Sequence, residues 1–152
     1  MLIGVISDTH GLLRPEALTT LRSVDHILHA GDIGDPGILD ALREIAPVTA
    51  IRGNVDTYGP CANLPATEAI ELAGSLIYIL HSIDDLDLKP EAAGISVVVY
   101  GHSHKPLIEH RQGVLYLNPG SAGPRRFNLP VTLALVEVTP GVISPRLLHV
   151  LS

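Results

Sequence analysis

Five short clusters of Asp, Asn and His recur along the chain, and almost every one directly follows an apolar run. Aspartate supplies an anionic oxygen, asparagine a neutral carbonyl oxygen and histidine a neutral imidazole nitrogen. Such mixed ligands suit divalent Mn, Fe, Zn, Co or Ni better than copper. The pattern predicts a metal centre assembled from most of the chain's length. The clusters are Asp8-Thr9-His10, Gly31-Asp32, Gly53-Asn54-Val55-Asp56, His81 and Gly101-His102-Ser103-His104.

Two of these clusters have the same one-residue spacing. Asp8 and His10 can share a face at a strand end and hold one ion, and the same holds for His102 and His104. Taken alone, the first pair is also compatible with a polar turn at the end of a strand. Alternating histidines at a strand end have fewer such explanations.

Asp32 is the natural bridge between two ions, because a carboxylate offers two oxygens. Asn54 adds an oxygen without adding negative charge, although Asp32 could instead cap the next segment and Asn54 could be a turn residue. Two divalent cations, two aspartates and one hydroxide leave a surplus of about one positive charge, which would attract a phosphate ester. Ions ~3.5–4 Å apart also generate hydroxide at neutral pH. The residues therefore predict metal-assisted phosphoester hydrolysis.

The apolar runs predict the strands that position these clusters. Strands are expected over residues 2–6, 24–29, 48–51 and 97–100, and helices are expected to begin at Pro15 and at Asp35-Pro36. The β-α-β-α-β order of the first half favours a parallel sheet with right-handed crossovers. Ligands of an open sheet bind where the strands end, which is where the clusters lie.

The second half of the chain does not continue the β-α-β-α-β order and is predicted to contain mostly strands. Ala73-Gly74 separates two runs that look like a hairpin, and a short helix is expected within residues 84–93. Further strands are expected over residues 114–117, 131–138 and 142–150. This mix predicts the α/β class, as a four-layer α/β/β/α sandwich formed by one domain of residues 1–152.

Composition limits the kinds of partner. The net charge is −6 and there is no Lys/Arg run, so no binding to duplex nucleic acid is expected. Cys61 is the single cysteine, which excludes an internal disulfide and a thiolate cluster. The apolar runs are too short to span a bilayer, and a secretory signal would include Asp8 and His10. A cytoplasmic protein without membrane contact is expected, and apolar C-terminal edge strands would support a homo-oligomer.

The ordered combination of these motifs resembles the calcineurin-like metallophosphoesterases, and is most similar to their small bacterial and archaeal phosphodiesterase branch. The resemblance extends from about Leu2 to Arg125 and includes the turn Asn118-Pro119-Gly120-Ser121. It implies the double-sheet sandwich, two divalent ions and hydrolysis of a small phosphate ester through a bridging hydroxide. Mn²⁺ is the metal that the family implies first, with Zn²⁺, Fe²⁺, Ni²⁺, Co²⁺ or Mg²⁺ as alternatives.

The resemblance also implies a role for each motif residue. One metal falls to Asp8, His10 and His104, and the other to Asn54, His81 and His102, with Asp32 between them. Asp32, Asn54 and His102 are the residues expected to act in catalysis. Arg125, which follows Pro124 as in many relatives, is expected to contact the substrate phosphate.

Two positions depart from the family pattern. Val55 stands where many phosphatase relatives have a histidine that can protonate the leaving group, which favours a phosphodiesterase acting on esters with good leaving groups. Ser82 follows His81 where relatives usually have glycine, and a serine disfavours a positive φ. Since some relatives, including a retromer scaffold subunit, serve mainly as interaction platforms, a scaffold role is the alternative. Asp56 either orients the site or forms a turn, and His29 is expected to pack or hydrogen-bond near the site.

Overall fold

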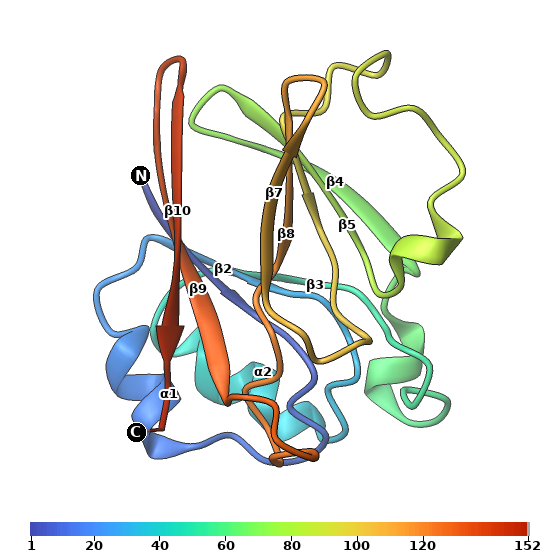
Figure 1. Cartoon of the computed structure of the whole chain (residues 1–152). Helices are drawn as coiled ribbons and strands as arrows, with labels where there is room; N and C mark the ends of the chain where they lie inside the picture. Colours follow the sequence, from blue (N-terminus) through green and yellow to red (C-terminus); the bar gives the residue numbers. More distant parts are fainter. Residues whose placement is uncertain (152) are drawn as a thin grey trace.

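Two five-stranded β-sheets pack face to face in the computed structural model, which describes residues 1–151 (Figure 1). The first sheet has the strand order β10-β9-β1-β2-β3. Strands β1, β2 and β3 run parallel, as the β-α-β-α-β pattern predicts, while β9 and β10 are antiparallel to their neighbours. The strands of this sheet are β1 (Leu2–Ile6), β2 (His26–His29), β3 (Val48–Ala50), β9 (Thr132–Thr139) and β10 (Val142–His149).

The second sheet has the order β4-β5-β6-β8-β7. β5, β6 and β8 run parallel to one another, and the hairpins add β4 and β7 as antiparallel edges. Its strands are β4 (Thr67–Leu72), β5 (Ser75–Leu80), β6 (Val97–Val99), β7 (Leu107–Arg111) and β8 (Val114–Asn118). Ile3 and Leu28 of the first sheet share a buried cluster with Ile79 and Leu117 of the second, so the two sheets enclose a common aliphatic core.

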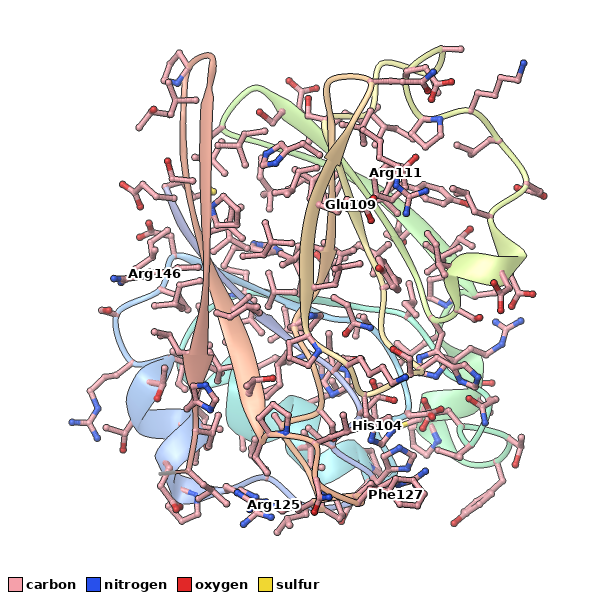
Figure 2. The ribbon with its side chains drawn as sticks, viewed as in Figure 1. His104, Glu109, Arg111, Arg125, Phe127 and Arg146 are labelled. Carbon is pink, nitrogen blue, oxygen red and sulfur yellow. The ribbon has the colours of Figure 1, made fainter. Side chains whose placement is uncertain are left out.

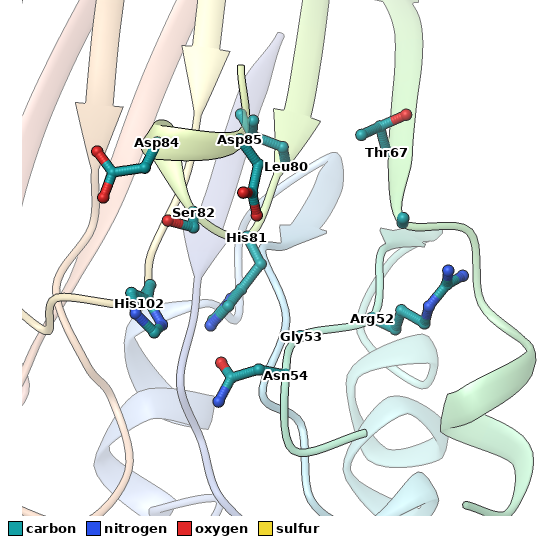
Figure 3. A pocket seen from close by; sticks show the side chains of 11 residues that line it. Arg52, Gly53, Asn54, Thr67, Leu80, His81, Ser82, Asp84, Asp85 and His102 are labelled. Atoms are coloured by element: carbon teal, nitrogen blue, oxygen red, sulfur yellow. The ribbon is translucent and has the colours of Figure 1, made fainter. Parts of the chain in front are cut away.

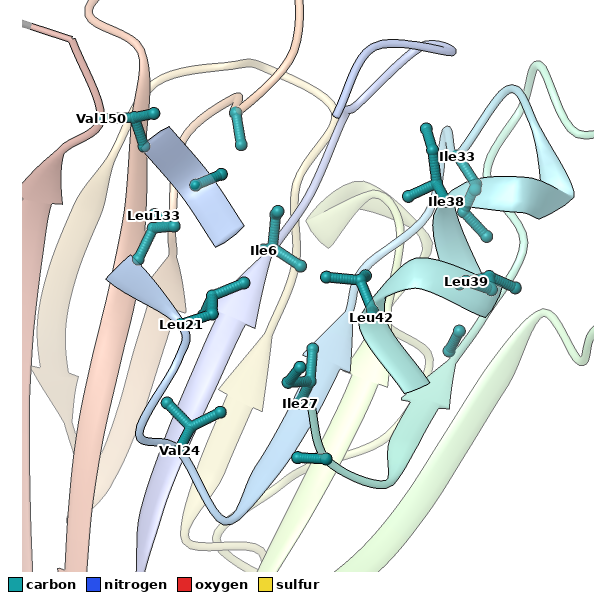
Figure 4. Packing of buried hydrophobic residues seen from close by; sticks show 14 of the residues in the cluster. Ile6, Leu21, Val24, Ile27, Ile33, Ile38, Leu39, Leu42, Leu133 and Val150 are labelled. Carbon is teal, nitrogen blue, oxygen red and sulfur yellow. The ribbon is translucent and has the colours of Figure 1, made fainter. Parts of the chain in front are cut away.

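Two helices cover the outer face of the first sheet. Helix α1 (Pro15–Thr20) and helix α2 (Pro36–Arg43) both have proline in their first turn, where its missing N–H leaves no bond unmade. The Asp35 side chain caps α2 by accepting a hydrogen bond from the Gly37 amide at 2.9 Å. Leu21, after α1, and Leu42 of α2 pack with Ile6 of β1 in the buried cluster of this face (Figure 4).

The outer face of the second sheet is covered by an irregular segment. The helix expected within residues 84–93 is wrong, because the segment contains only one 3₁₀ turn, η2 (Ile83–Asp85), and a turn around Pro90. Its apolar side chains Leu86 and Leu88 still pack against the sheet. The α/β sandwich is confirmed, with this segment in place of the second helical layer. Strand β7 was not expected, because it is a half-exposed edge strand with few apolar residues. No helix within residues 1–151 has the length and apolar character needed to cross a membrane.

The site lies where the parallel strands of both sheets end. Clusters follow β1, β2 and β3 in one sheet and β5 and β6 in the other. The two sheet edges are joined there, because the His102 amide donates to Asp8 Oδ2 at 3.1 Å and His81 Nδ1 lies 2.7 Å from the Ala30 carbonyl oxygen. Residues from most of the chain therefore meet at one edge of the sandwich, as predicted.

Candidate metal centre

The first ligand group consists of Asp8, His10 and His104, whose donor atoms all lie within 4.8 Å of one another. Asp8 Oδ1 is 3.7 Å from His10 Nε2 and 3.4 Å from His104 Nε2. Two ligands that each lie about 2.1 Å from one ion are separated by roughly 3.0–3.5 Å. The three donor atoms are thus placed to hold a single divalent ion.

The second group consists of Asp32, His81 and His102, again within 4.8 Å. Figure 3 shows Asn54 beside His81 and His102. His81 Nε2 is 3.1 Å from Asp32 Oδ2. The Asn54 side-chain oxygen is 3.0 Å from His81 Nε2 and 3.1 Å from Asp32 Oδ2, so it faces other acceptors. Hydrogen bonding alone would favour the reversed amide, whereas a cation among these lone pairs favours the oxygen.

Asp32 lies between the two groups. Its Oδ2 atom is 3.5 Å from His10 Nε2 in one group and 3.1 Å from His81 Nε2 in the other. Its Oδ1 atom accepts a hydrogen bond from the Val55 amide at 3.0 Å. Oδ2 is therefore the Asp32 oxygen that faces both groups, and bridging of two ions by Asp32 stays a prediction.

Three buried polar atoms of the first group have no hydrogen-bond partner within residues 1–151: Asp8 Oδ1, His10 Nε2 and His104 Nδ1. An unsatisfied buried polar group costs about 1–3 kcal/mol. A divalent cation satisfies Asp8 Oδ1 and His10 Nε2 at once, since carboxylate oxygen and imidazole nitrogen are both good ligands for it. His104 faces the same position with Nε2, so its Nδ1 is not satisfied in this way. The donor set therefore fits a divalent metal.

The backbone of the ligand residues is strained. Asp8, His10, Asp32, His102 and His104 have φ angles of 55°, 45°, 56°, 71° and 63°. This left-handed conformation costs an L-residue about 1–2 kcal/mol. Strain of this kind persists only where the surroundings enforce it, and it gathers at functional sites. It turns the side chains that follow β1, β2 and β6 into one shared space.

The Asp56 carboxylate joins two of the ligand loops. It is buried and accepts hydrogen bonds from the amides of Ile33 and Gly34, each at 3.1 Å, and of Gly53 at 2.9 Å. The first two amides belong to the loop that contains Asp32, and Gly53 directly precedes Asn54. Of the two roles expected for Asp56, orientation of the site is the one that the structure shows.

Glycine stands directly before Asn54 and His102, where the chains approach too closely for a side chain. A Cβ atom on Gly53 would lie 2.2 Å from Asp32 Oδ1, and one on Gly101 would lie 2.2 Å from Ser7 Oγ. Real Cβ atoms do not come this close to another heavy atom. The glycines of the Gly-Asn and Gly-His motifs are thus explained by close packing, and the residues that follow them by metal chemistry.

His29 supports the site from beneath. It is fully buried, accepts from the Gly31 amide at 3.1 Å through Nδ1, and lies 3.1 Å from Thr9 Oγ1 through Nε2. Burial lowers its pKa to about 4, against partial compensation from Asp8 and Asp56, so the ring is neutral at pH 7. His29 therefore hydrogen-bonds near the site, as expected.

The serine that follows His81 does not distort the backbone there. Ser82 has φ −114° and ψ 130°, an extended conformation that any L-residue adopts. The 2.7 Å contact between His81 Nδ1 and the Ala30 carbonyl assigns the proton to Nδ1 and leaves Nε2 free to face Asp32.

The carboxylates are ionised over a wide pH range. Burial raises the pKa of Asp8, but the adjacent imidazoles of His10, His104 and His81 and the hydrogen bond from the Ser7 hydroxyl outweigh it, so the net shift is downward. The pKa of Asp32 is likewise lowered, because the contacts of His81 and the Val55 amide outweigh burial. Both side chains are anionic at neutral pH, which is the form that binds metal.

A cavity of about 500 Å³ opens beside the second group and is lined in part by Asn54, His81 and His102 (Figure 3). Arg125 does not line it; that residue lies exposed in the loop between β8 and β9, with Phe127 (Figure 2). Arg52 lines it instead. The sequence analysis missed Arg52, whose only signal was its place directly before Gly53-Asn54.

The turn Asn118-Pro119-Gly120-Ser121 lies directly behind the ligand loops, in agreement with the resemblance. Ser121 Oγ donates to the Asp8 carbonyl at 2.9 Å, and the Asn118 amide donates to the Gly101 carbonyl at 3.2 Å. It therefore fixes the loops that follow β1 and β6.

The sequence is similar to those of proteins described as probable metallophosphoesterases. The chain is 40% identical over 134 residues to a probable metallophosphoesterase of Methanocaldococcus jannaschii, covering 80% of this chain and 68% of that protein. It is 36% identical over 148 residues to a probable metallophosphoesterase of Methanothermobacter thermautotrophicus, covering 89% and 85%. Among solved structures, an archaeal phosphodiesterase has a TM-score of 0.80 at 23% identity, covering 97% of this chain and all of that one.

Structures of Vps29 have a similar fold. Vps29 of Chaetomium thermophilum has a TM-score of 0.77 at 19% identity, covering 97% of this chain and 95% of that one. A model of the calcineurin-like phosphoesterase superfamily domain matches residues 1–141. Together with the two archaeal relatives, this match shows that the chain belongs to the calcineurin-like phosphoesterase superfamily.

Proposed function

We propose that this protein is a metal-dependent phosphodiesterase that holds two divalent ions and acts on a small phosphate ester. The observation that supports this best is the position of Asp32 Oδ2, 3.5 Å from His10 of one ligand group and 3.1 Å from His81 of the other. One carboxylate oxygen between two donor sets is an arrangement that suits a dinuclear centre. Asp8, His10 and His104 hold one ion, and Asn54, His81 and His102 hold the other.

The two ions would polarise the phosphate oxygens and lower the pKa of water, and Mn²⁺ is the proposed metal. Asn54, His81 and His102 line the cavity beside the site, so a phosphate that enters this cavity meets the second ligand group. The proposal extends to a cytoplasmic location, to Asp32, Asn54 and His102 as the catalytic residues, and to Arg125 as a phosphate contact only after movement of its exposed loop.

The preference for diesters with good leaving groups follows from Val55. Its side chain is 40% exposed beside Asn54 and has no proton to donate to a departing alkoxide. Esters whose alcohol leaves as a stable anion need no such donor. The archaeal phosphodiesterase of similar fold is consistent with this choice.

The test is hydrolysis of bis-p-nitrophenyl phosphate by metal-depleted protein, with and without added Mn²⁺. The matched variant Asp32→Asn keeps the shape of the side chain and removes its charge. Metal-dependent turnover that falls at least about a hundredfold in this variant supports the proposal. Turnover that is absent with Mn²⁺, or equal in the variant, contradicts it.

A scaffold role is the second candidate, because several Vps29 structures share the fold and one of them is complexed with zinc. A bound ion is thus no proof of catalysis. The same assay separates the two: close to two bound ions per chain without turnover of the diester favours the scaffold over the enzyme.

A further inference from the structure

The cavity beside the second ligand group has walls of opposite charge. Asp84 and Asp85 of η2 form one side, and Arg52 lies on the other side beneath Thr67 (Figure 3). None of these three side chains forms a salt bridge within 4.0 Å among residues 1–151. Their charges are therefore available to whatever enters the cavity.

Arg52 is held in place by hydrogen bonds, and most of its guanidinium N–H donors remain unused in the part of the chain that the structure describes. Its Nη1 donates to the Leu64 carbonyl at 2.6 Å, and its backbone amide donates to the Pro65 carbonyl at 2.9 Å. A guanidinium has five N–H donors, and this contact uses one. A tethered guanidinium loses less side-chain entropy on binding than a free one, so it is a good partner for an anionic oxygen group.

The position of the cavity indicates which part of a bound substrate would contact its walls. Its lining includes Asn54, His81 and His102 of the second ligand group, and Arg52 is the only Lys or Arg among its lining residues. A phosphate held at the metal centre would project one ester arm along this wall. The volume of about 500 Å³ is enough for an arm the size of a nucleoside.

We propose that Arg52 is a specificity-determining residue that binds an anionic group on the ester arm retained in the cavity, such as a second phosphate. Asp84 and Asp85 repel that group from the opposite wall and so direct it toward Arg52. This inference rests on the proposed phosphodiesterase function and names the class of diester that the site prefers.

Two substrates that differ only in the anionic group give the test. They are thymidine 5′-(p-nitrophenyl phosphate) and the same compound with an added 3′-phosphate, both followed by release of p-nitrophenolate. The expected ratio of kcat/KM is about five- to tenfold in favour of the 3′-phosphate, the effect of one charge-assisted hydrogen bond at an exposed side chain. Arg52→Met brings this ratio close to one, and Arg52→Lys keeps part of it.

Control variants separate binding from folding. Arg22→Met removes an exposed arginine beyond α1 and leaves the ratio unchanged, whereas Asp85→Asn raises it because a repelling charge is lost. A merely structural Arg52 would slow both substrates equally, so the ratio would survive in Arg52→Met. That result, or a wild-type ratio near one, overturns the assignment. No metal-dependent turnover of either compound or of bis-p-nitrophenyl phosphate contradicts the phosphodiesterase function itself.

Discussion

At the scale of single residues, the ligands and their supports do different physical work. Asp8 and Asp32 supply charge, while Asp56 is a buried carboxylate whose oxygens accept only backbone N–H groups. That the candidate ligands lie together was predictable because metal chemistry restricts residue type and because each follows an apolar run. Arg52 was not predictable, since a lone arginine before Gly-Asn has no pattern of its own and becomes visible only through the cavity.

Asp56→Asn is expected to weaken metal binding about 10- to 100-fold, the usual effect of disturbing a group that orients ligands. One oxygen becomes an NH₂ that faces amides already donating, so the loops of Asp32 and Asn54 separate. Titration with Mn²⁺ followed by calorimetry measures the change. Asp40→Asn, an exposed change on α2, is the matched control, and equal affinity in both variants would show that Asp56 has no orienting role.

Val55→His tests whether the missing proton donor explains the preference for good leaving groups. A histidine placed directly after Asn54 adds a proton donor beside the site, so hydrolysis of alkyl phosphate monoesters should rise by about 10-fold or more. Val55→Gln, which is similar in reach but cannot act as an acid near pH 7, is the control. If the histidine variant binds two ions and still gains nothing on these monoesters, the missing donor does not explain the preference.

At the scale of elements, the strands were predictable and the covering segments less so. β1 and β6 are continuous apolar runs, because both faces of each are buried. β7 is a half-exposed edge strand, and the segment that begins at η2 packs a few leucines without helical periodicity. Periodic patterns arise from repeated burial, so elements without it leave little trace in a sequence.

His29 of β2 makes the stability of the fold depend on pH. Its pKa is about 4 in the folded protein, below the ordinary value of 6.5. Between these two pH values, His29 is protonated in the unfolded chain and neutral in the folded protein. The contribution of His29 is therefore complete above pH 6.5 and is lost as the pH falls toward 4, at up to about 3 kcal/mol.

Urea unfolding of wild type and His29→Gln between pH 4.5 and 7.5 measures this effect. The variant cannot titrate here, so its free energy of unfolding should depend less steeply on pH over this interval, by up to one proton. Parallel pH dependence of the two proteins would show that His29 does not set the acid sensitivity.

At the scale of the whole molecule, the site lies at the junction of two sheets. The strained ligand loops and the facing atoms Asp8 Oδ1, His10 Nε2 and His104 Nε2 come from both halves of the chain. Their like-signed lone pairs repel one another, and a cation between them turns that repulsion into attraction. The sequence alone could predict that these residues meet, but not that Asp32 would present a single oxygen to both groups.

Metal binding should consequently stabilise the entire fold. A ligand at 100 times its dissociation constant adds about 2.7 kcal/mol to the free energy of unfolding, so Mn²⁺ should raise the melting temperature by several degrees and EDTA should reverse the rise. Asp8→Asn should reduce the shift, because Asp8 contacts both halves of the molecule. Mn²⁺ that stabilises wild type and this variant equally must bind elsewhere.

The most direct test of the dinuclear centre is a crystal structure of the protein soaked with Mn²⁺, with anomalous diffraction to locate the ions. We expect two peaks roughly 3.5–4 Å apart, one among Asp8, His10 and His104 and one among Asn54, His81 and His102, with Asp32 Oδ2 between them. A single peak, or peaks away from these residues, would contradict the two-metal account.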